Sequence, residues 1–139
     1  MGMSERSGVR PERASTDGRK QRDGIAFIGG MGMKTGDSDL LFVEGQLPED
    51  GDRIASDESP ARQLKRCLND LESQVRRHGA TMDDVLKVTL YLADMDAYDA
   101  VNEAYQEVWE DSYPARTTVG VCELLGGATV TLDAVVAIE

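Results

Sequence analysis

The order of predicted elements indicates a two-layer α+β sandwich with the sequence β-β-α-β-α-β-β. Two segments carry apolar residues at helical spacing, each with a single apolar stripe, and five others have the composition and alternation of strands. Two helices with one apolar stripe each must pack on the same side of a sheet, which leaves its other side without helices. The length of 139 residues suits one such domain.

The first 24 residues differ in composition from the rest of the chain. They are rich in Ser, Gly, Arg and Asp and have no apolar periodicity, so we expect a disordered or loosely attached leader over residues 1–24 and a folded domain over 25–139. Ile25 to Met33 then predicts a short strand that runs into a glycine-rich bend. No Gly-Lys-Ser/Thr follows these glycines, so they do not match a phosphate-binding loop.

The next strand and the first helix have clear ends. Leu40 to Leu47 predicts a strand that stops at Pro48. Ser59 is a plausible N-cap with Pro60 at the first helical position, and the helix should end at His78-Gly79. We interpret the single histidine as part of this helix end rather than as a catalyst. The apolar stripe of the helix contains Leu64, Cys67, Leu68, Leu71 and Val75.

A further strand and a second helix follow. Val85 to Leu92 alternates apolar and polar residues, which predicts a strand with one buried face. The second helix is expected at about Asp96 to Glu110. Its aromatic residues are interpreted as core rather than as a cradle for a cofactor; they are Tyr98, Tyr105 and Trp109.

The C-terminal part predicts a β-hairpin that starts at Pro114, with Gly126-Gly127 as its two loop residues. In that register Val119 faces Ala134 and Val121 faces Leu132 on an aliphatic face. The opposite face should then be small and polar, comprising Arg116, Thr118, Gly120, Cys122, Thr131, Asp133, Val135 and Ala137. Together with Lys87, Thr89 and Tyr91, such a helix-free face predicts contact with other subunits in a barrel-like oligomer.

Charge and hydropathy exclude several classes of protein. The net charge is −11, and residues 1–24 carry six basic and four acidic side chains, so the body is still more acidic. An acidic domain repels phosphate backbones, which argues against nucleic-acid binding. A cytosol rich in salt would also favour an acidic surface. No apolar run approaches the length of a membrane span and the N-terminus lacks an apolar signal region, so we expect a cytoplasmic protein without membrane contact.

The cysteine and histidine content predicts neither a metal site nor a cofactor. Cys67 and Cys122 lie in apolar patterns rather than at the spacing of metal ligands, and we interpret both as reduced core residues. One histidine makes a zinc site or a histidine-based catalytic site improbable.

Four stretches of the sequence, taken in order, resemble one known family. They are Glu44–Pro48, Asp83–Leu92, Val101–Tyr105 and Tyr113–Val119. At these intervals they closely resemble the reactive intermediate deaminase (Rid, YjgF-type) family, over about Leu40 to Ile138. The resemblance implies a chorismate-mutase-like fold, a homotrimer with three inter-subunit clefts, and hydrolysis of small 2-imino acids or their enamine tautomers to 2-keto acids and ammonia.

The same resemblance implies roles for particular residues. An arginine at the position of Arg116 holds the substrate carboxylate, and a planar guanidinium can make two parallel charge-assisted bonds to that group. Backbone N–H groups near Gly45 and Thr118 would complete the cradle, with Asn102 beside the cleft. Thr131 stands where deaminating members commonly place a glutamate that helps to hold the attacking water.

The chain also departs from the family pattern. Met31-Gly32-Met33 replaces the usual Tyr-Ser-Gln, Thr118 replaces a frequent cysteine, and Thr131 is a far weaker base than glutamate. Asp133 lies two residues further on and could substitute only if the register or the water position differs. Two functions therefore stay open. The protein is either a deaminase or a non-catalytic trimer, and such a trimer would bind either small carboxylates, such as 2-keto acids, or a protein partner. Arg116 could instead form a salt bridge to Asp133 of a neighbouring subunit.

Overall fold

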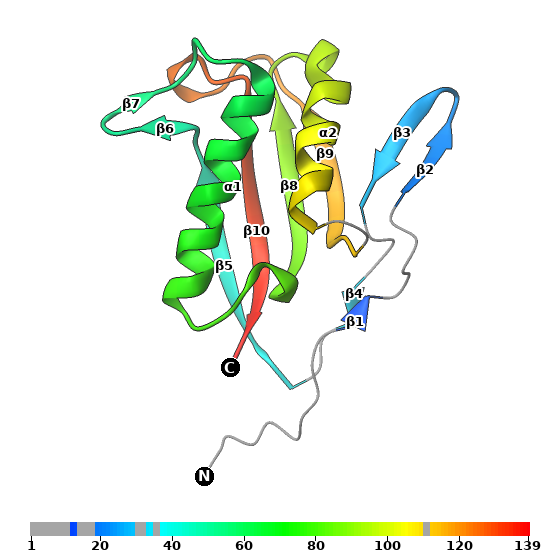
Figure 1. The fold of residues 1–139 in the computed structure, drawn as a ribbon, viewed down its shortest axis with the longest axis vertical. Coiled ribbons are helices and arrows are strands. Elements are labelled where there is room, and N and C mark those ends of the chain that lie inside the picture. Colours follow the sequence, from blue (N-terminus) through cyan, green and yellow to red (C-terminus); the bar gives the residue numbers. More distant parts are fainter. Residues whose placement is uncertain (1–11, 14–18, 30–32, 35–36, 110–111) are drawn as a thin grey trace.

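The centre of the protein is a four-stranded sheet with the strand order β5-β10-β8-β9. The computed structural model describes residues 12–13, 19–29, 33–34, 37–109 and 112–139. The sheet strands are β5 (Asp39–Gln46), β8 (Val85–Leu92), β9 (Ala115–Gly120) and β10 (Val130–Ile138). Helices α1 (Pro60–Arg77) and α2 (Tyr98–Trp109) lie side by side over one face (Figure 1). The predicted two-layer α+β architecture is confirmed.

Shorter elements flank this sheet. The strand predicted from Ile25 is present as β3 (Ile25–Ile28), but it pairs with β2 (Arg19–Arg22) in a hairpin that projects beside α2 (Figure 1). Residues 1–11 and 14–18 lie outside the described residues, as does Met31-Gly32, so the disordered leader stays a prediction. The remaining short elements are β1 (Glu12–Arg13), β4 (Met33–Lys34), β6 (Glu49–Asp50), β7 (Arg53–Ile54) and the 3₁₀ turns η1 (Met82–Asp84), η2 (Met95–Ala97) and η3 (Leu125–Gly127).

Helix α1 begins and ends as its sequence predicts. The Ser59 hydroxyl accepts a hydrogen bond from the N–H of Arg62 at 3.3 Å, and Pro60 is the first helical residue. At the other end the N–H of His78 donates to the carbonyl of Val75 at 3.1 Å. Gly79 follows with φ of +79°, a conformation that favours glycine. The capping role assigned to His78 is confirmed.

The hydrophobic core lies between the two helices and one face of the sheet. On β8, Val88, Leu90 and Leu92 are fully buried on the helix side. Lys87, Thr89 and Tyr91 alternate with them and are only half-buried. Complete burial of one aliphatic side chain contributes about 1.5–3 kcal/mol, so this face stabilises the fold. Other core residues are Leu64, Leu71, Val75, Val101, Tyr105, Val130, Leu132 and Val136.

The predicted C-terminal hairpin is wrong. Strands β9 and β10 do not pair with each other: β9 pairs in parallel with β8, and β10 lies between β5 and β8 and pairs antiparallel with both. Gly126 and Gly127 do adopt positive φ angles of 66° and 77°, but they do so in the turn η3, within a connection that passes from the edge of the sheet to β10. The expected pairs Val119–Ala134 and Val121–Leu132 therefore do not form.

This topology separates residues that the hairpin would have placed together. In the parallel pairing with β8, Arg116 is opposite Val88 and Thr118 is opposite Leu90, so both side chains lie on the helix-covered face. In the other pairing of β8, Thr131 is opposite Tyr91 and Asp133 is opposite Thr89, on the face without helices. The prediction of one polar face is corrected accordingly. Side-chain alternation has a period of two, so an incorrect pairing can reverse the face assigned to every residue.

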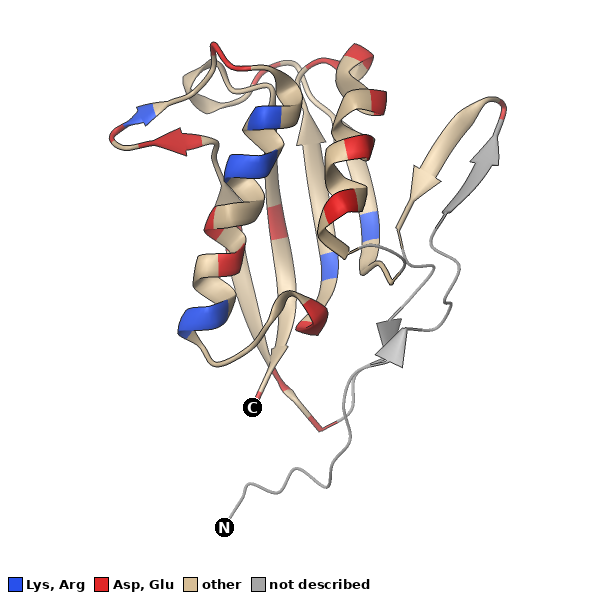
Figure 2. Ribbon diagram, viewed as in Figure 1, with Lys and Arg blue, Asp and Glu red and all other residues tan. Residues whose placement is uncertain are grey.

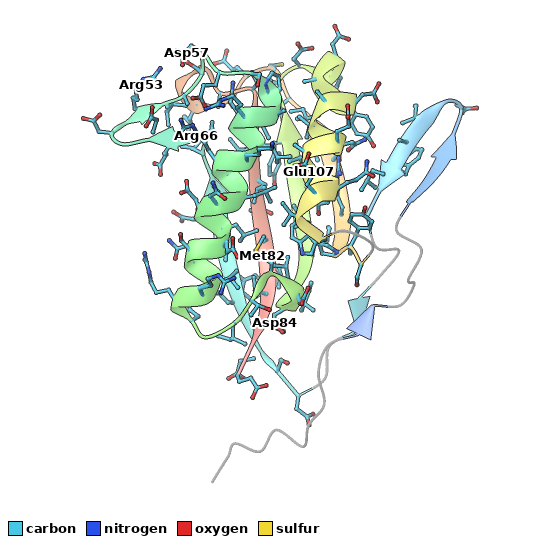
Figure 3. The ribbon with its side chains drawn as sticks, viewed as in Figure 1. Arg53, Asp57, Arg66, Met82, Asp84 and Glu107 are labelled. Carbon is cyan, nitrogen blue, oxygen red and sulfur yellow. The ribbon has the colours of Figure 1, made fainter. Side chains whose placement is uncertain are left out.

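Polar contacts hold the ends of the two layers together (Figure 3). Arg53 of β7 pairs with Asp57 at 2.7 Å, and Arg66 of α1 pairs with Glu58 at 2.6 Å. Arg66 also lies 3.8 Å from Asp50 of β6, which ties the β6–β7 hairpin to the helix. The hydrogen bond from Arg66 lowers the pKa of Glu58. At the opposite end, the indole N–H of Trp109 donates to the carbonyl of Met82 at 2.9 Å. These contacts fix the loops around the helix ends.

The two cysteines have different environments. Cys67 is buried in α1, where burial raises the pKa of its thiol to about 12. Cys122 is exposed just beyond the end of β9, so the prediction that both cysteines are core residues is wrong for Cys122. Its neighbours in sequence suggested a continuing strand, but β9 ends at Gly120.

No helix among the described residues combines the length and the apolar character that crossing a lipid bilayer requires.

Candidate anion-binding site

Arg116 is the centre of the candidate site. It is the second residue of the edge strand β9, and its side chain turns toward α2. Its Nε donates to the hydroxyl of Thr118 at 3.0 Å, and its Nη2 donates to Oδ1 of Asn102 at 2.7 Å. Thr118 lies two residues along the same strand, on the same face, while α2 supplies Asn102. The structure therefore brings together three of the residues that the sequence predicted for binding.

Aromatic rings surround the guanidinium group. The Arg116 Cζ lies 4.5 Å from the centroid of the Tyr105 ring and 5.8 Å from that of Tyr98, both within the range of cation–π attraction. The Tyr105 ring packs in turn against Trp109 at 4.8 Å and Tyr113 at 6.4 Å. Tyr105 and Trp109 are core residues as predicted, whereas Tyr98 is partly buried and packs against the core; Tyr105 also supports the cation.

The electrostatic surroundings of Arg116 leave its charge uncompensated. Among the described residues no carboxylate forms an ion pair with it, and burial lowers the pKa of its guanidinium, opposed by the hydroxyls of Tyr105 and Tyr98. Arginine nevertheless stays protonated at neutral pH because its ordinary pKa is above 12. A buried cation held by rings and neutral oxygens is a site that favours an anion.

The pattern of donors shows which kind of anion fits. Nη1 is buried and has no hydrogen-bond partner among the described residues. A guanidinium has five N–H donors, and here Nε and one N–H of Nη2 are already used. The outer edge formed by Nη1 and Nη2 is left for two parallel hydrogen bonds, which is the geometry that a carboxylate accepts.

Gly45, also predicted for binding, is not near Arg116 within one chain. It lies on β5, at the opposite edge of the sheet from β9, and β10 and β8 separate the two strands. Three strand spacings amount to about 14 Å. Gly45 sits in an irregularity of β5, because the register changes between the pairs Leu132–Gln46 and Ala134–Val43. A cradle that includes Gly45 thus requires a second chain.

Thr131 is likewise separated from Arg116, because it lies on the open face of the sheet. Its cross-strand neighbour Tyr91 donates a hydrogen bond from its hydroxyl to Oδ2 of Asp133 at 3.0 Å. This bond raises the pKa of Tyr91. Asp133 and Arg116 are on opposite faces of the sheet in one chain, and the alternative salt bridge from Arg116 to Asp133 of a neighbouring subunit stays a prediction.

Residues before the sheet, which no pattern in the sequence predicted as part of the site, complete the surroundings of Arg116. The carbonyl of Ala26 accepts hydrogen bonds from the Tyr98 hydroxyl at 2.7 Å and from Nδ2 of Asn102 at 3.4 Å. A Cβ at Gly29 would lie 2.7 Å from the Cβ of Arg116, so only glycine fits. The helical spacing of Tyr98, Asn102 and Tyr105 could have indicated their shared face, but no local signal predicts the approach of Gly29.

Among the residues that the structure describes, no group of three or more His, Cys, Asp or Glu side chains is arranged to hold a metal ion.

Fold and site together define a two-layer α+β protein with a partly buried arginine at a sheet edge, whose Nη1 has no hydrogen-bond partner among the described residues. The sequence profile of the family described as endoribonuclease L-PSP matches residues 32–138. The chain belongs to this family, which is also called the YjgF or Rid family. The predicted family relationship is confirmed.

Named relatives cover most of the folded domain. A RutC family protein of Pyrococcus abyssi is 33% identical over 69% of this chain and 76% of its own length. A protein of Dermatophagoides farinae named 2-iminobutanoate/2-iminopropanoate deaminase is 30% identical over 71% of this chain and 78% of its own. The human protein of the same name is 26% identical over 68% of this chain and 70% of its own length.

Solved structures agree with the fold. A crystal structure from Thermotoga maritima, described as a candidate endoribonuclease, superposes with a TM-score of 0.66 at 30% identity, covering 72% of this chain and 80% of the other. The YjgF gene product of Escherichia coli has a TM-score of 0.63 at 21% identity, covering 73% and 82% of the two chains. At that lower identity the likeness shows the fold alone.

Proposed function

We propose that this protein hydrolyses small 2-imino acids, or their enamine tautomers, to 2-keto acids and ammonia. The observation that carries the proposal is the buried Arg116 guanidinium, which has no carboxylate partner among the described residues and keeps Nη1 unpaired. Two relatives at 30% and 26% identity bear the name of this activity, which supports the choice of substrate.

The reaction suits a site that positions its substrate without a covalent nucleophile. The oxygen of a water molecule adds to the imine carbon, the resulting tetrahedral adduct loses its C–N bond, and the protons of the water pass to the departing ammonia. Arg116 would hold the carboxylate beside the reacting carbon, with Thr118 and Asn102 fixing the guanidinium. Such catalysis depends on orientation and electrostatics.

We further propose that the active form is a homotrimer with sites between chains. Gly45 and Arg116 occupy opposite edges of one sheet, so contact between chains would be needed to bring a β5 edge to a β9 edge. The helix-free face also exposes Leu40, Phe42 and Val119, and Phe42 is 72% exposed. Thr131, on this face, would then hold the attacking water from a neighbouring chain.

A second candidate is a trimer that binds 2-keto acids or other small carboxylates without turnover. It is favoured by the surroundings of Arg116, where the described residues of one chain supply amide, hydroxyl and aromatic groups but no carboxylate base. A protein partner, in place of a small molecule, would meet the same open sheet face.

Nucleic acid does not fit the charge distribution. Acidic residues recur along α2, the helix that supplies Asn102 (Figure 2). They include Asp99, Glu103 and Glu107 at helical spacing. A surface of this sign repels phosphates, and Arg116 alone forms no basic stripe.

The test is the hydrolysis of freshly generated 2-iminopropanoate and 2-iminobutanoate, with semicarbazide competing for the imine. Wild type should release keto acid faster than buffer, at low or at molar salt, whereas Arg116→Ala should match buffer. Arg62→Ala is the matched control because Arg62 is an exposed arginine of α1. If wild type releases keto acid no faster than buffer while it remains folded and trimeric, the proposed catalysis on these imines is wrong. Calorimetric titration with 2-oxobutanoate then tests the binding-only function.

A further inference from the structure

The hairpin of β2 and β3 reaches the candidate site from outside the family-matched region. The family profile begins at residue 32, whereas the hairpin and the residue after it span Arg19–Gly29, here called the N-terminal arm. The arm projects from the domain next to α2, and its β3 end lies beside β9 (Figure 1). Ile28 is buried in the hydrophobic core, so this end of the arm is part of the packed structure.

One backbone carbonyl joins the arm to the arginine network. The carbonyl of Ala26 accepts the Tyr98 hydroxyl at 2.7 Å, and the weaker second bond comes from Nδ2 of Asn102 at 3.4 Å. The same amide accepts a hydrogen bond from Arg116 through Oδ1. The arm, Asn102 and the guanidinium therefore form one connected set of hydrogen bonds, and the Tyr98 bond is its shortest link to the arm.

Packing places the arm close against the arginine. A Cβ at Gly29 would overlap the Cβ of Arg116, so the arm backbone touches the stem of that side chain. Nη1 of Arg116 is at the same time buried. A carboxylate that binds to Nη1 needs the surroundings of the guanidinium to open.

We propose that Tyr98 is a specificity-determining positioning residue whose hydroxyl holds the N-terminal arm closed over Arg116. The closed arm restricts the site to small carboxylates, because a larger ligand requires the arm to move further. This inference rests on the proposed role of Arg116 as a carboxylate site. The selectivity for ligand size then depends on the contact of Tyr98, on helix α2, with Ala26 in the N-terminal arm, which precedes the family-matched region.

The first test measures access to Arg116 without any ligand. Phenylglyoxal modifies arginine, and the reaction at Arg116 can be followed by mass spectrometry on the peptide 112–123, released by cleavage at Asp and Glu. Tyr98→Phe removes the hydroxyl but keeps the ring near the guanidinium. Loss of one net hydrogen bond should speed modification of Arg116 by about threefold to tenfold. The exposed Arg62 serves as the internal reference and should react at an unchanged rate.

Tyr91→Phe is the matched control. It also loses one tyrosine hydroxyl bond, to Asp133, but on the opposite face of the sheet. Its Arg116 should react as slowly as in wild type, and both variants should keep the unfolding midpoint of wild type within a few degrees. Equal rates of Arg116 modification in Tyr98→Phe and wild type would overturn the proposal.

The second test measures selectivity by calorimetric titration with 2-oxobutanoate and with phenylpyruvate. Tyr98→Phe should improve the affinity for phenylpyruvate relative to 2-oxobutanoate by at least threefold, and Tyr91→Phe should not. An unchanged ratio would overturn the role of Tyr98 in selectivity. If neither acid binds to wild type while Tyr98→Phe still speeds modification of Arg116, the carboxylate site is wrong and the arm contact stands.

Discussion

The two faces of the sheet carry different kinds of polar residue. On the helix-covered face, Arg116 is enclosed by Asn102, Thr118 and aromatic rings. On the open face, Tyr91 and Asp133 form a partly exposed pair. The difference indicates that the sheet separates two tasks. One face holds a cation largely away from water, and we propose that the other offers polar and apolar groups to a neighbouring chain.

The largest effect on stability should come from the buried face of β8. Leu90→Ala removes a fully buried side chain, and we expect it to lower the free energy of unfolding by about 2–5 kcal/mol. Thr89→Ala, one residue away on the open face, should change it by less than about 0.5 kcal/mol. Urea unfolding followed by Trp109 fluorescence measures both. Similar losses in the two variants would show that the open face is also packed within one chain.

Arg116 should be important for function and not for stability. Arg116→Met should reduce kcat/KM, or ligand affinity, by about 100-fold, since charged hydrogen bonds to a buried ligand are lost. Its free energy of unfolding should be equal to that of wild type or higher, because the variant no longer buries a cation without a counter-ion. Imine hydrolysis and urea unfolding of the same preparation test this. A loss of more than about 2 kcal/mol in stability would make Arg116 a structural residue.

The open face should control assembly. Phe42→Asp places a charge at the most exposed aromatic residue of β5, and we expect it to weaken association by about 2–3 kcal/mol without unfolding the chain. Light scattering after size exclusion should give about three times the 15.1 kDa of one chain for wild type and a lower mass for the variant. Asp99→Asn on the outer surface of α2 is the control. A monomeric wild type would contradict the proposed trimer.

Thr131 should contribute less than Arg116. Thr131→Val keeps the shape of the side chain but removes the hydroxyl that would hold water, and we expect turnover to fall by less than about tenfold. KM should stay unchanged, because in the proposed site Thr131 holds the attacking water and not the substrate carboxylate. Steady-state kinetics separates these two constants. A large rise in KM would place Thr131 in ligand binding.

The smallest expected effect is that of Asp70 on stability. Like Arg116, Asp70 buries a polar atom, its Oδ2, without a hydrogen-bond partner among the described residues. Burial, and then the charge of Glu49, raises the pKa of Asp70. Its protonated form is therefore favoured in the folded state, and stability decreases as pH rises from the unfolded pKa of about 3.9 through the raised folded value.

Asp70→Asn should therefore stabilise the protein at pH 7, by less than about 1 kcal/mol because the residue is only partly buried and solvent screens its charge. The gain should vanish near pH 3, where the wild-type side chain is protonated in both states. Thermal unfolding at the two pH values measures the difference. An equal gain in stability at both pH values would show that the gain has a cause other than the charge of Asp70.

Local features were predicted well from the sequence. The caps of α1 at Ser59 and His78, the alternation of β8 and the apolar stripe of α1 depend on neighbouring residues, so their patterns are visible in the chain. The strands on either side of Gly126-Gly127 were also identified, but their pairing was wrong. Strand pairing joins segments distant in sequence, and two glycines indicate a turn without naming the partners of the strands that it connects.

The candidate site was predicted in part. Arg116, Thr118 and Asn102 follow from the family resemblance, and the structure brings them together. Thr131 and Gly45 follow from the same resemblance, and one chain does not bring either to Arg116. The contacts of Tyr98 and Gly29 with the site were not predicted at all, because they depend on how the N-terminal arm packs.

The sequence by itself determined the family, the fold class, both helices and the identity of the arginine, because these follow from local spacing and from characteristic motifs. Only the tertiary structure decided which way Arg116 points. Its face is set by the parallel pairing of β9 with β8, and a parallel pair is joined by the crossover through α2 rather than by a turn. That pairing places the guanidinium against Tyr105 and Asn102, where a buried charge can be held for a ligand.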